Sequence, residues 1–145
     1  ASQLQPKARG LRYENIRSAR AEEGLLRLLM LDPGLAGKMD GMTGEEFSSP
    51  LLGKAFDRLR SRAVEGLSTQ LDALAGEFER EEMDHLAQVA IQPESVANSA
   101  RSIRDYIDII RGGHQLRKSG EQHDELLLAA QKRFQQKKAY MEESK

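Results

Sequence analysis

Residues 20–33 read RAEEGLLRLLMLDP and contain the one sustained apolar run of the sequence. Six of the seven positions from Leu25 to Leu31 are apolar, and only Arg27 interrupts them. A helix that is apolar on most of its circumference is normally enclosed by other parts of the protein. We therefore expect a central helix over residues 18–31, with Leu25, Leu28 and Leu29 in the core.

The rest of the chain is polar. Charged residues make up 31% of the 145 residues, hydrophobic residues make up 39%, and there is no Trp or Cys. This composition favours a single helix-rich domain, and the lack of cysteine excludes disulfides and thiolate chemistry. The apolar run is far shorter than the roughly 20 residues that a membrane span needs, so we expect a soluble chain, and the lack of cysteine fits a cytosolic protein. The chain begins with Ala and shows no signal-peptide pattern, so we expect a piece of a longer protein.

Short helices are predicted after the central one by capping residues, prolines and apolar spacing. Asp32-Pro33 and Ser49-Pro50 each place a capping side chain before a proline, and Thr43 with Glu46 has the spacing of a capping box. We expect an all-α, multi-helix bundle over residues 18–111. Its helices are expected over residues 32–39, 43–47, 49–66, 68–76, 79–91 and 98–111. Its structural core is expected to contain Leu25, Leu28, Leu29, Phe47, Phe56, Leu59, Tyr106 and Ile110.

The two ends of the chain differ from the predicted bundle. Residues 1–17 lack apolar periodicity and are expected to be a linker or a disordered tail. Residues 21–98 carry seven basic and fifteen acidic side chains, whereas ten basic and seven acidic residues follow from Arg101 onward. Gly112-Gly113 is expected to bend or end the preceding helix, because each glycine costs about 1 kcal/mol relative to alanine. A final helix is expected over residues 122–141.

Catalytic motifs are not recognisable in the sequence. It has no Gly-rich phosphate-binding loop, and its histidines, His85, His114 and His123, are widely spaced. Glu82 and His85 form one Glu-x-x-His pair, but di-metal sites in helical bundles need two such pairs. We favour a solvated helix face for this pair over a metal-dependent enzyme, and we expect no catalytic residue and no metal site. The near-neutral charge also makes any contact with nucleic acid auxiliary at most.

The last predicted helix carries more apolar surface than a solvated helix needs. Leu126 or Leu127, together with Ala130, Phe134 and Met141, fall on one face, and lysines and Arg133 surround them. This face either folds back onto the bundle or binds another protein. The residue pattern leaves both possibilities open.

Three segments resemble the C-terminal helicase-binding domain of bacterial DnaG-type DNA primases. They are AEEGLLRLLMLDP (residues 21–33), EEFSSPLLGKAFDRL (45–59) and SARSIRDYIDIIR (99–111), and LLLAAQKRFQQKKAY (126–140) is similar in placement to the terminal hairpin of that family. A related pattern occurs in the N-terminal domain of DnaB-type replicative helicases, which is the alternative. A short basic helix at the end of the chain favours the primase, because a long linker and an ATPase domain follow in the helicase.

The resemblance implies a helical bundle and a C-terminal helical hairpin over residues 112–145. The hairpin would bind the N-terminal domains of the replicative helicase, and the chain alone would be a monomer in the bacterial cytoplasm. Zinc and magnesium would be bound by upstream primase domains, so no cofactor is expected in this chain. The helicase-binding residues implied by position are Leu126, Leu127, Ala130, Arg133, Phe134, Lys137 and Tyr140.

Overall fold

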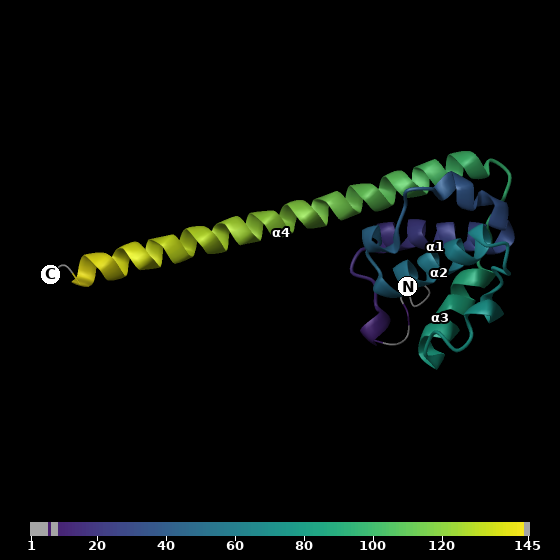
Figure 1. The fold of residues 1–145 in the computed structure, drawn as a ribbon, viewed down its shortest axis with the longest axis horizontal. Helices are drawn as coiled ribbons and strands as arrows, with labels where there is room; N and C mark the ends of the chain where they lie inside the picture. Colours follow the sequence, from purple (N-terminus) through teal and green to yellow (C-terminus); the bar gives the residue numbers. More distant parts are fainter. Residues whose placement is uncertain (1–5, 7–8, 144–145) are drawn as a thin grey trace. The chain divides into compact units, whose positions relative to one another are not determined.

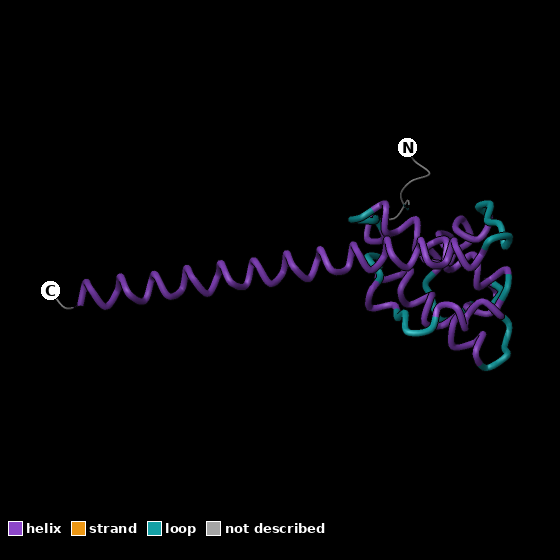
Figure 2. Tube along the Cα trace, turned by 90° about the horizontal axis from the view of Figure 1, so that it is seen from above, coloured by secondary structure: helices purple, strands orange, loops and turns teal. Residues whose placement is uncertain are grey.

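The computed structural model describes residue 6 and residues 9–143, with side chains given except for residues 9, 122–125 and 132–143. Over this range the secondary structure is entirely helical, without a strand (Figure 2). The α-helices are α1 (Ile16–Leu31), α2 (Pro50–Val64), α3 (Arg80–Ile91) and α4 (Ser99–Glu143). The short 3-10 helices are η2 (Arg9–Leu11), η3 (Pro33–Met39), η4 (Gly44–Glu46) and η5 (Leu71–Leu74). The predicted all-α fold is confirmed.

The chain divides into two compact units, Ala1–His114 and Gln115–Lys145. The first unit is a bundle in which α1 lies among α2, α3 and η3 (Figure 1). Leu25, Leu28 and Leu29 of α1 have no exposed surface. Burial of each such side chain contributes about 1.5–3 kcal/mol relative to exposure, so α1 makes a large contribution to core stability.

The other expected core residues surround α1. Phe47 and Phe56 pack with their ring centroids 4.9 Å apart. Leu59 and Ile110 are fully buried, and Tyr106 is half-buried at the edge of the core.

The helix starts follow the capping side chains. Asp32 Oδ1 accepts a hydrogen bond from the Gly34 amide at 3.0 Å, and Ser49 Oγ accepts one from the Leu52 amide at 3.2 Å. Glu46 Oε2 accepts a hydrogen bond from the Thr43 amide at 3.0 Å. These contacts satisfy amides that have no partner within the first turn of a helix.

The start of the chain differs from the expected tail. Helix α1 begins at Ile16, where Asn15 Oδ1 accepts a hydrogen bond from the Ser18 amide at 3.1 Å. Tyr13 is only 8% exposed. The expected linker or disordered tail at residues 1–17 is therefore wrong for residues 9–17, and residues 1–5, 7 and 8 lie outside the described range.

The end of the chain also differs. Helix α4 continues through Gly112 and Gly113 to Glu143, so the expected helix end at this pair is wrong. The described backbone of residues 112–143 is one helix, and the expected C-terminal helical hairpin is wrong as well. A glycine lowers the stability of a helix but does not by itself end it. Helix-forming residues on both sides allow an existing helix to propagate past it.

A buried carboxylate joins α1 to the start of α2. Glu22 has no exposed surface, and its Oε2 accepts hydrogen bonds from the Ser48 amide at 2.8 Å and the Ser48 hydroxyl at 2.7 Å. Its Oε1 accepts a third hydrogen bond from the Ser49 amide at 3.1 Å. One acidic side chain thus satisfies the backbone just before α2.

We predict that Glu22→Ala lowers the free energy of unfolding by at least about 2 kcal/mol, because it leaves buried donors without an acceptor. Urea unfolding followed by circular dichroism at 222 nm measures this loss. Glu45→Ala is the matched control, since Glu45 is exposed in a neighbouring segment and should change stability by less than about 0.5 kcal/mol. Equal effects of the two substitutions would contradict the role given to Glu22.

Candidate protein-binding site on helix α4

The first turns of α4 are part of the bundle. Ile103 and Ile110, two turns apart, are 1% and 0% exposed. Between them the Tyr106 ring lies directly over Gly24 of α1. A Cβ atom at position 24 would come within 2.4 Å of Tyr106 Cε2, so only glycine allows this contact.

A polar network holds the same turns. The Tyr106 hydroxyl donates a hydrogen bond to Glu94 Oε2 at 3.0 Å, and Arg27 Nε forms an ion pair with Glu94 Oε1 at 3.1 Å. Arg27 Nη1 also donates to the Val89 carbonyl at 3.3 Å. Burial, together with the hydrogen bond to the Glu94 carboxylate, raises the pKa of Tyr106, so its hydroxyl stays protonated as a donor at neutral pH.

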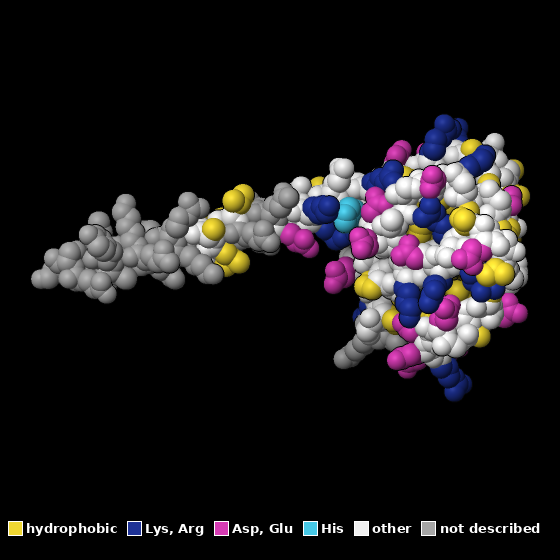
Figure 3. Space-filling view, in the orientation of Figure 1, with side chains coloured by type: hydrophobic (Ala, Val, Ile, Leu, Met, Phe, Trp, Pro, Cys, Tyr) yellow, Lys and Arg dark blue, Asp and Glu magenta, His cyan; other side chains and the backbone are white. Residues whose placement is uncertain are grey.

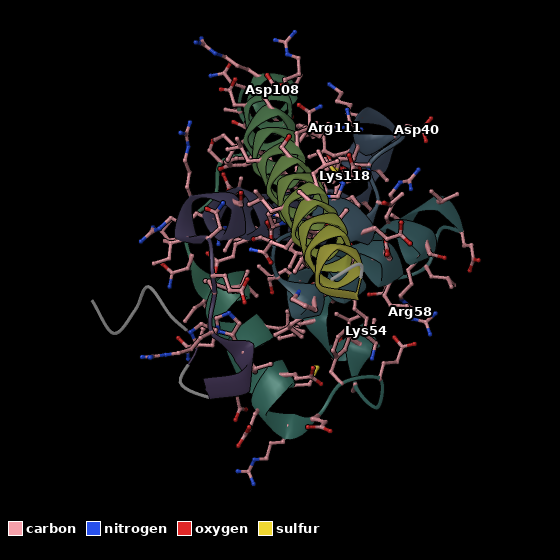
Figure 4. All side chains as sticks on the ribbon, turned by 90° about the vertical axis from the view of Figure 1, so that its left-hand side faces the viewer. Asp40, Lys54, Arg58, Asp108, Arg111 and Lys118 are labelled. Atoms are coloured by element: carbon pink, nitrogen blue, oxygen red, sulfur yellow. The ribbon has the colours of Figure 1, made fainter. Side chains whose placement is uncertain are left out.

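Arg111 ties the next turn of α4 to the segment around η4. Its Nε donates to Glu46 Oε1 at 3.0 Å, and its Nη2 donates to the Gly41 carbonyl at 3.2 Å. Figure 4 shows Arg111 on the same side of the bundle as Asp40. The part of α4 that belongs to the first unit is thus fixed by apolar and polar contacts.

The second unit carries exposed leucines on α4. Leu126, Leu127 and Leu128 are 67%, 49% and 58% exposed, and Ala130 is exposed as well. Figure 3 shows hydrophobic side chains on the surface of this unit. Single exposed leucines are common on protein surfaces, but a contiguous group marks a candidate interaction site.

The helical register separates these leucines. At 100° per residue, the seven expected helicase-binding positions fall within an arc of about 140° on the helix. Leu128 lies nearly opposite the centre of this arc. The candidate site is therefore a stripe of α4 that contains Leu126, Leu127 and Ala130; we call it the α4 stripe. The remaining expected positions, Arg133, Phe134, Lys137 and Tyr140, lie on the described backbone, but their side chains lie outside the described residues.

Basic residues occur along the same part of α4 as the α4 stripe. Residues 126–141 contain Lys132, Arg133, Lys137 and Lys138 and no acidic residue. A helix with apolar and basic side chains in this arrangement is suited to an apolar partner surface with acidic residues at its edge.

Glu82 and His85 have different partners in the structure. Glu82 Oε1 accepts a hydrogen bond from the Glu79 amide at 2.8 Å and so caps α3. The His85 side chain is only 13% exposed and contacts the Tyr13 hydroxyl. The expected solvated face is therefore wrong for His85. Within the part of the chain that the structure describes, no group of three His, Asp or Glu side chains could hold a metal ion.

Sequence reasoning missed a polar cluster formed by Tyr13, Glu23 and His85. Its members come from the segment before α1, from α1 and from α3. Tyr13 and His85 are 72 positions apart, so no local motif relates them. A single tyrosine in a mostly polar segment was the one available signal in the sequence.

A groove of about 490 Å³ lies between η4 and α2 and is lined in part by Lys54 and Arg58 (Figure 4). Both basic side chains form contacts with other residues of the bundle. Lys54 Nζ donates to the Glu77 carbonyl at 3.0 Å and lies 4.6 Å from the centroid of the Phe78 ring, and Arg58 pairs with Glu77 at 3.0 Å. These contacts fasten α2 to the loop before α3, so we assign the groove a structural role.

The described helices include none that is both long and apolar enough to cross a bilayer. Comparisons with protein-family models, with curated proteins and with solved structures gave no match. The functional argument therefore depends on the residues and contacts of this chain.

We predict opposite effects for two glycine substitutions in helices. Gly112→Ala should stabilise α4 by about 1 kcal/mol, because the added Cβ meets nothing within 4 Å beyond the nearby backbone of its own helix. Gly24→Ala should destabilise the bundle by about 1–3 kcal/mol, because its Cβ would overlap the Tyr106 ring. Hydrogen exchange of α4 amides measures the first effect, and urea unfolding measures the second. A Gly24→Ala variant as stable as the wild type would contradict this packing of Tyr106.

Proposed function

We propose that this chain is the helicase-binding domain of a bacterial DnaG-type DNA primase and that it recruits the primase to the replicative helicase. The support comes from the three segments at residues 21–33, 45–59 and 99–111, which resemble that family. The exposed Leu126 and Leu127 of the α4 stripe are the observation that carries the binding role.

The α4 stripe has the features of a helical docking surface. Apolar side chains on one helix face supply a few buried anchors, and these anchors dominate the affinity of an interface. The basic side chains around them increase the rate of encounter with an acidic surface. A ring helicase presents several copies of its N-terminal domain, so several primases can bind one ring and gain from multivalency.

The proposal assigns no catalytic step to this chain. Primer synthesis, with its zinc and magnesium, would belong to other domains of the parent primase, a cytoplasmic bacterial enzyme. The role of this chain would be to bring that enzyme to the replication fork and to adjust the activity of helicase and primase. Contact of its basic residues with DNA would be auxiliary.

The N-terminal domain of the helicase itself is the alternative, because a similar A-E-x-x-L-L helix and Y-x-D-I-I-R helix occur there. The two proposals differ in self-association. A primase domain should be monomeric at micromolar concentration, whereas a helicase domain should form rings. Light scattering coupled to size-exclusion chromatography distinguishes them.

We predict that Leu127→Ala weakens binding to a purified DnaB-type helicase by about tenfold, because truncation of a buried apolar anchor costs about 1.4 kcal/mol. Isothermal titration calorimetry measures this change, and Phe134→Ala should have an equal or larger effect.

Leu128→Ala is the matched control for this experiment. The two leucines are neighbours of similar exposure, but Leu128 lies outside the α4 stripe, so its truncation should change the affinity by less than about twofold. A wild-type chain that fails to bind helicase would overturn the proposed function. Equal losses from Leu127→Ala and Leu128→Ala would overturn the choice of face.

A further inference from the structure

The segment before α1 is fastened across the bundle. We call residues 9–15, which include η2, the N-terminal strap. Its Tyr13 side chain is 8% exposed, and Leu11 packs against the core from a partly buried position. The strap therefore covers part of the surface formed by α1 and α3, the helices that carry the polar partners of Tyr13.

Three polar groups meet beneath the strap. The Tyr13 hydroxyl donates a hydrogen bond to Glu23 Oε2 of α1 at 2.7 Å and also contacts His85 Nε2 of α3. The Tyr13 and His85 rings meet edge to face, with centroids 5.5 Å apart and an angle of 65° between their planes. His85 Nε2 lies 4.0 Å from Glu23 Oε2.

The hydrogen bonds determine the protonation state that fits this arrangement. A tyrosine hydroxyl has one proton, and the Glu23 carboxylate can only accept, so that proton lies between Tyr13 and Glu23. The Tyr13 oxygen must then accept from His85, which requires a proton on Nε2. A neutral His85 with Nε2 protonated satisfies both contacts and leaves Nδ1 without a proton.

A second proton on His85 is disfavoured while the strap is in place. Burial lowers the pKa of His85, and the Glu23 carboxylate raises it by a smaller amount. The charged groups of α1 that affect the pKa of Tyr13 are Glu22, Glu23 and Arg27. Undocking of the strap would let water reach the imidazolium, so protonation favours the undocked form.

We propose that the N-terminal strap is a pH-sensitive latch, closed over neutral His85 and released when His85 gains a second proton. The sign follows from proton linkage. The pKa of His85 is lower in the closed form than in the open form. Closure is therefore fully favoured above the ordinary histidine pKa of about 6.5, and it weakens as the pH falls below that value. When the latch opens, Tyr13 leaves Glu23, and the chain before α1 loses its fixed path.

The test uses the full chain with carbon-13 in its tyrosine rings. The chain has three tyrosines, and Tyr13→Phe identifies the Tyr13 signal by its loss. Between pH 7.5 and pH 5 the Tyr13 signal of the wild type should move toward the position of an exposed tyrosine. Its midpoint should match the midpoint of His85 measured in the same sample, and the His85 midpoint should lie below the ordinary histidine pKa of about 6.5.

His85→Gln provides the decisive comparison, because its side-chain amide can donate to Tyr13 but cannot gain a proton. The Tyr13 signal of this variant should stay constant over the same pH range. His114→Gln is the matched control and should behave as the wild type. If His85→Gln fails to fold by circular dichroism, the relative midpoints in the wild type still decide.

Three results would overturn the latch. The first is a Tyr13 signal that does not move in the wild type. The second is an equal movement in His85→Gln, which would show that His85 does not cause the change. The third is a His85 midpoint at or above the ordinary histidine pKa of about 6.5.

Discussion

The structure depends on the enclosure of α1. A helix with so many apolar positions cannot stay stable in water alone, so α2, α3 and η3 pack against it and leave only a narrow exposed face that includes Leu31. Leu25, Leu26, Leu28 and Leu29 are all fully buried, and the buried positions of α1 together cover about 240° of the helix, more than the apolar stripe of a surface helix. Short 3-10 helices and tight proline-led starts let a small polar chain surround such a helix on several sides.

Enclosure of α1 also decides what its charged residues do. A charged group that is removed from water needs partners, because desolvation costs several kcal/mol when it is not compensated. Glu22 binds the backbone before α2, Glu23 binds the strap, and Arg27 pairs with Glu94 in the loop before α4. Each buried or half-buried charge of α1 thus fixes a different segment on the core. The same residues that would weaken a buried helix determine where its neighbours attach.

The sequence predicted the parts of the fold that local chemistry decides. Asp32 and Ser49 cap the expected helices, and the core leucines of α1 follow from a single apolar run. Two features could not be read in this way. The strap depends on contacts between Tyr13 and a histidine 72 positions away, and no periodicity encodes such a contact. The low helix propensity of Gly112-Gly113 indicated a helix end. The preceding turns of α4, however, are held in the core by Ile103 and Ile110, and the helix propagates from them past the two glycines.

The exposed leucines of α4 limit the shape of any partner. Leu126, Leu127 and Leu128 are consecutive, so their side chains spread over about 200° of the helix surface. A flat partner surface covers less than half of a helix and can bury Leu126 and Leu127 together, but not Leu128 as well. Burial of all three needs a groove or a pair of helices that receives α4 from two sides. The α4 stripe, in which apolar positions continue past residue 130, fits a partner that lies along the helix on one side.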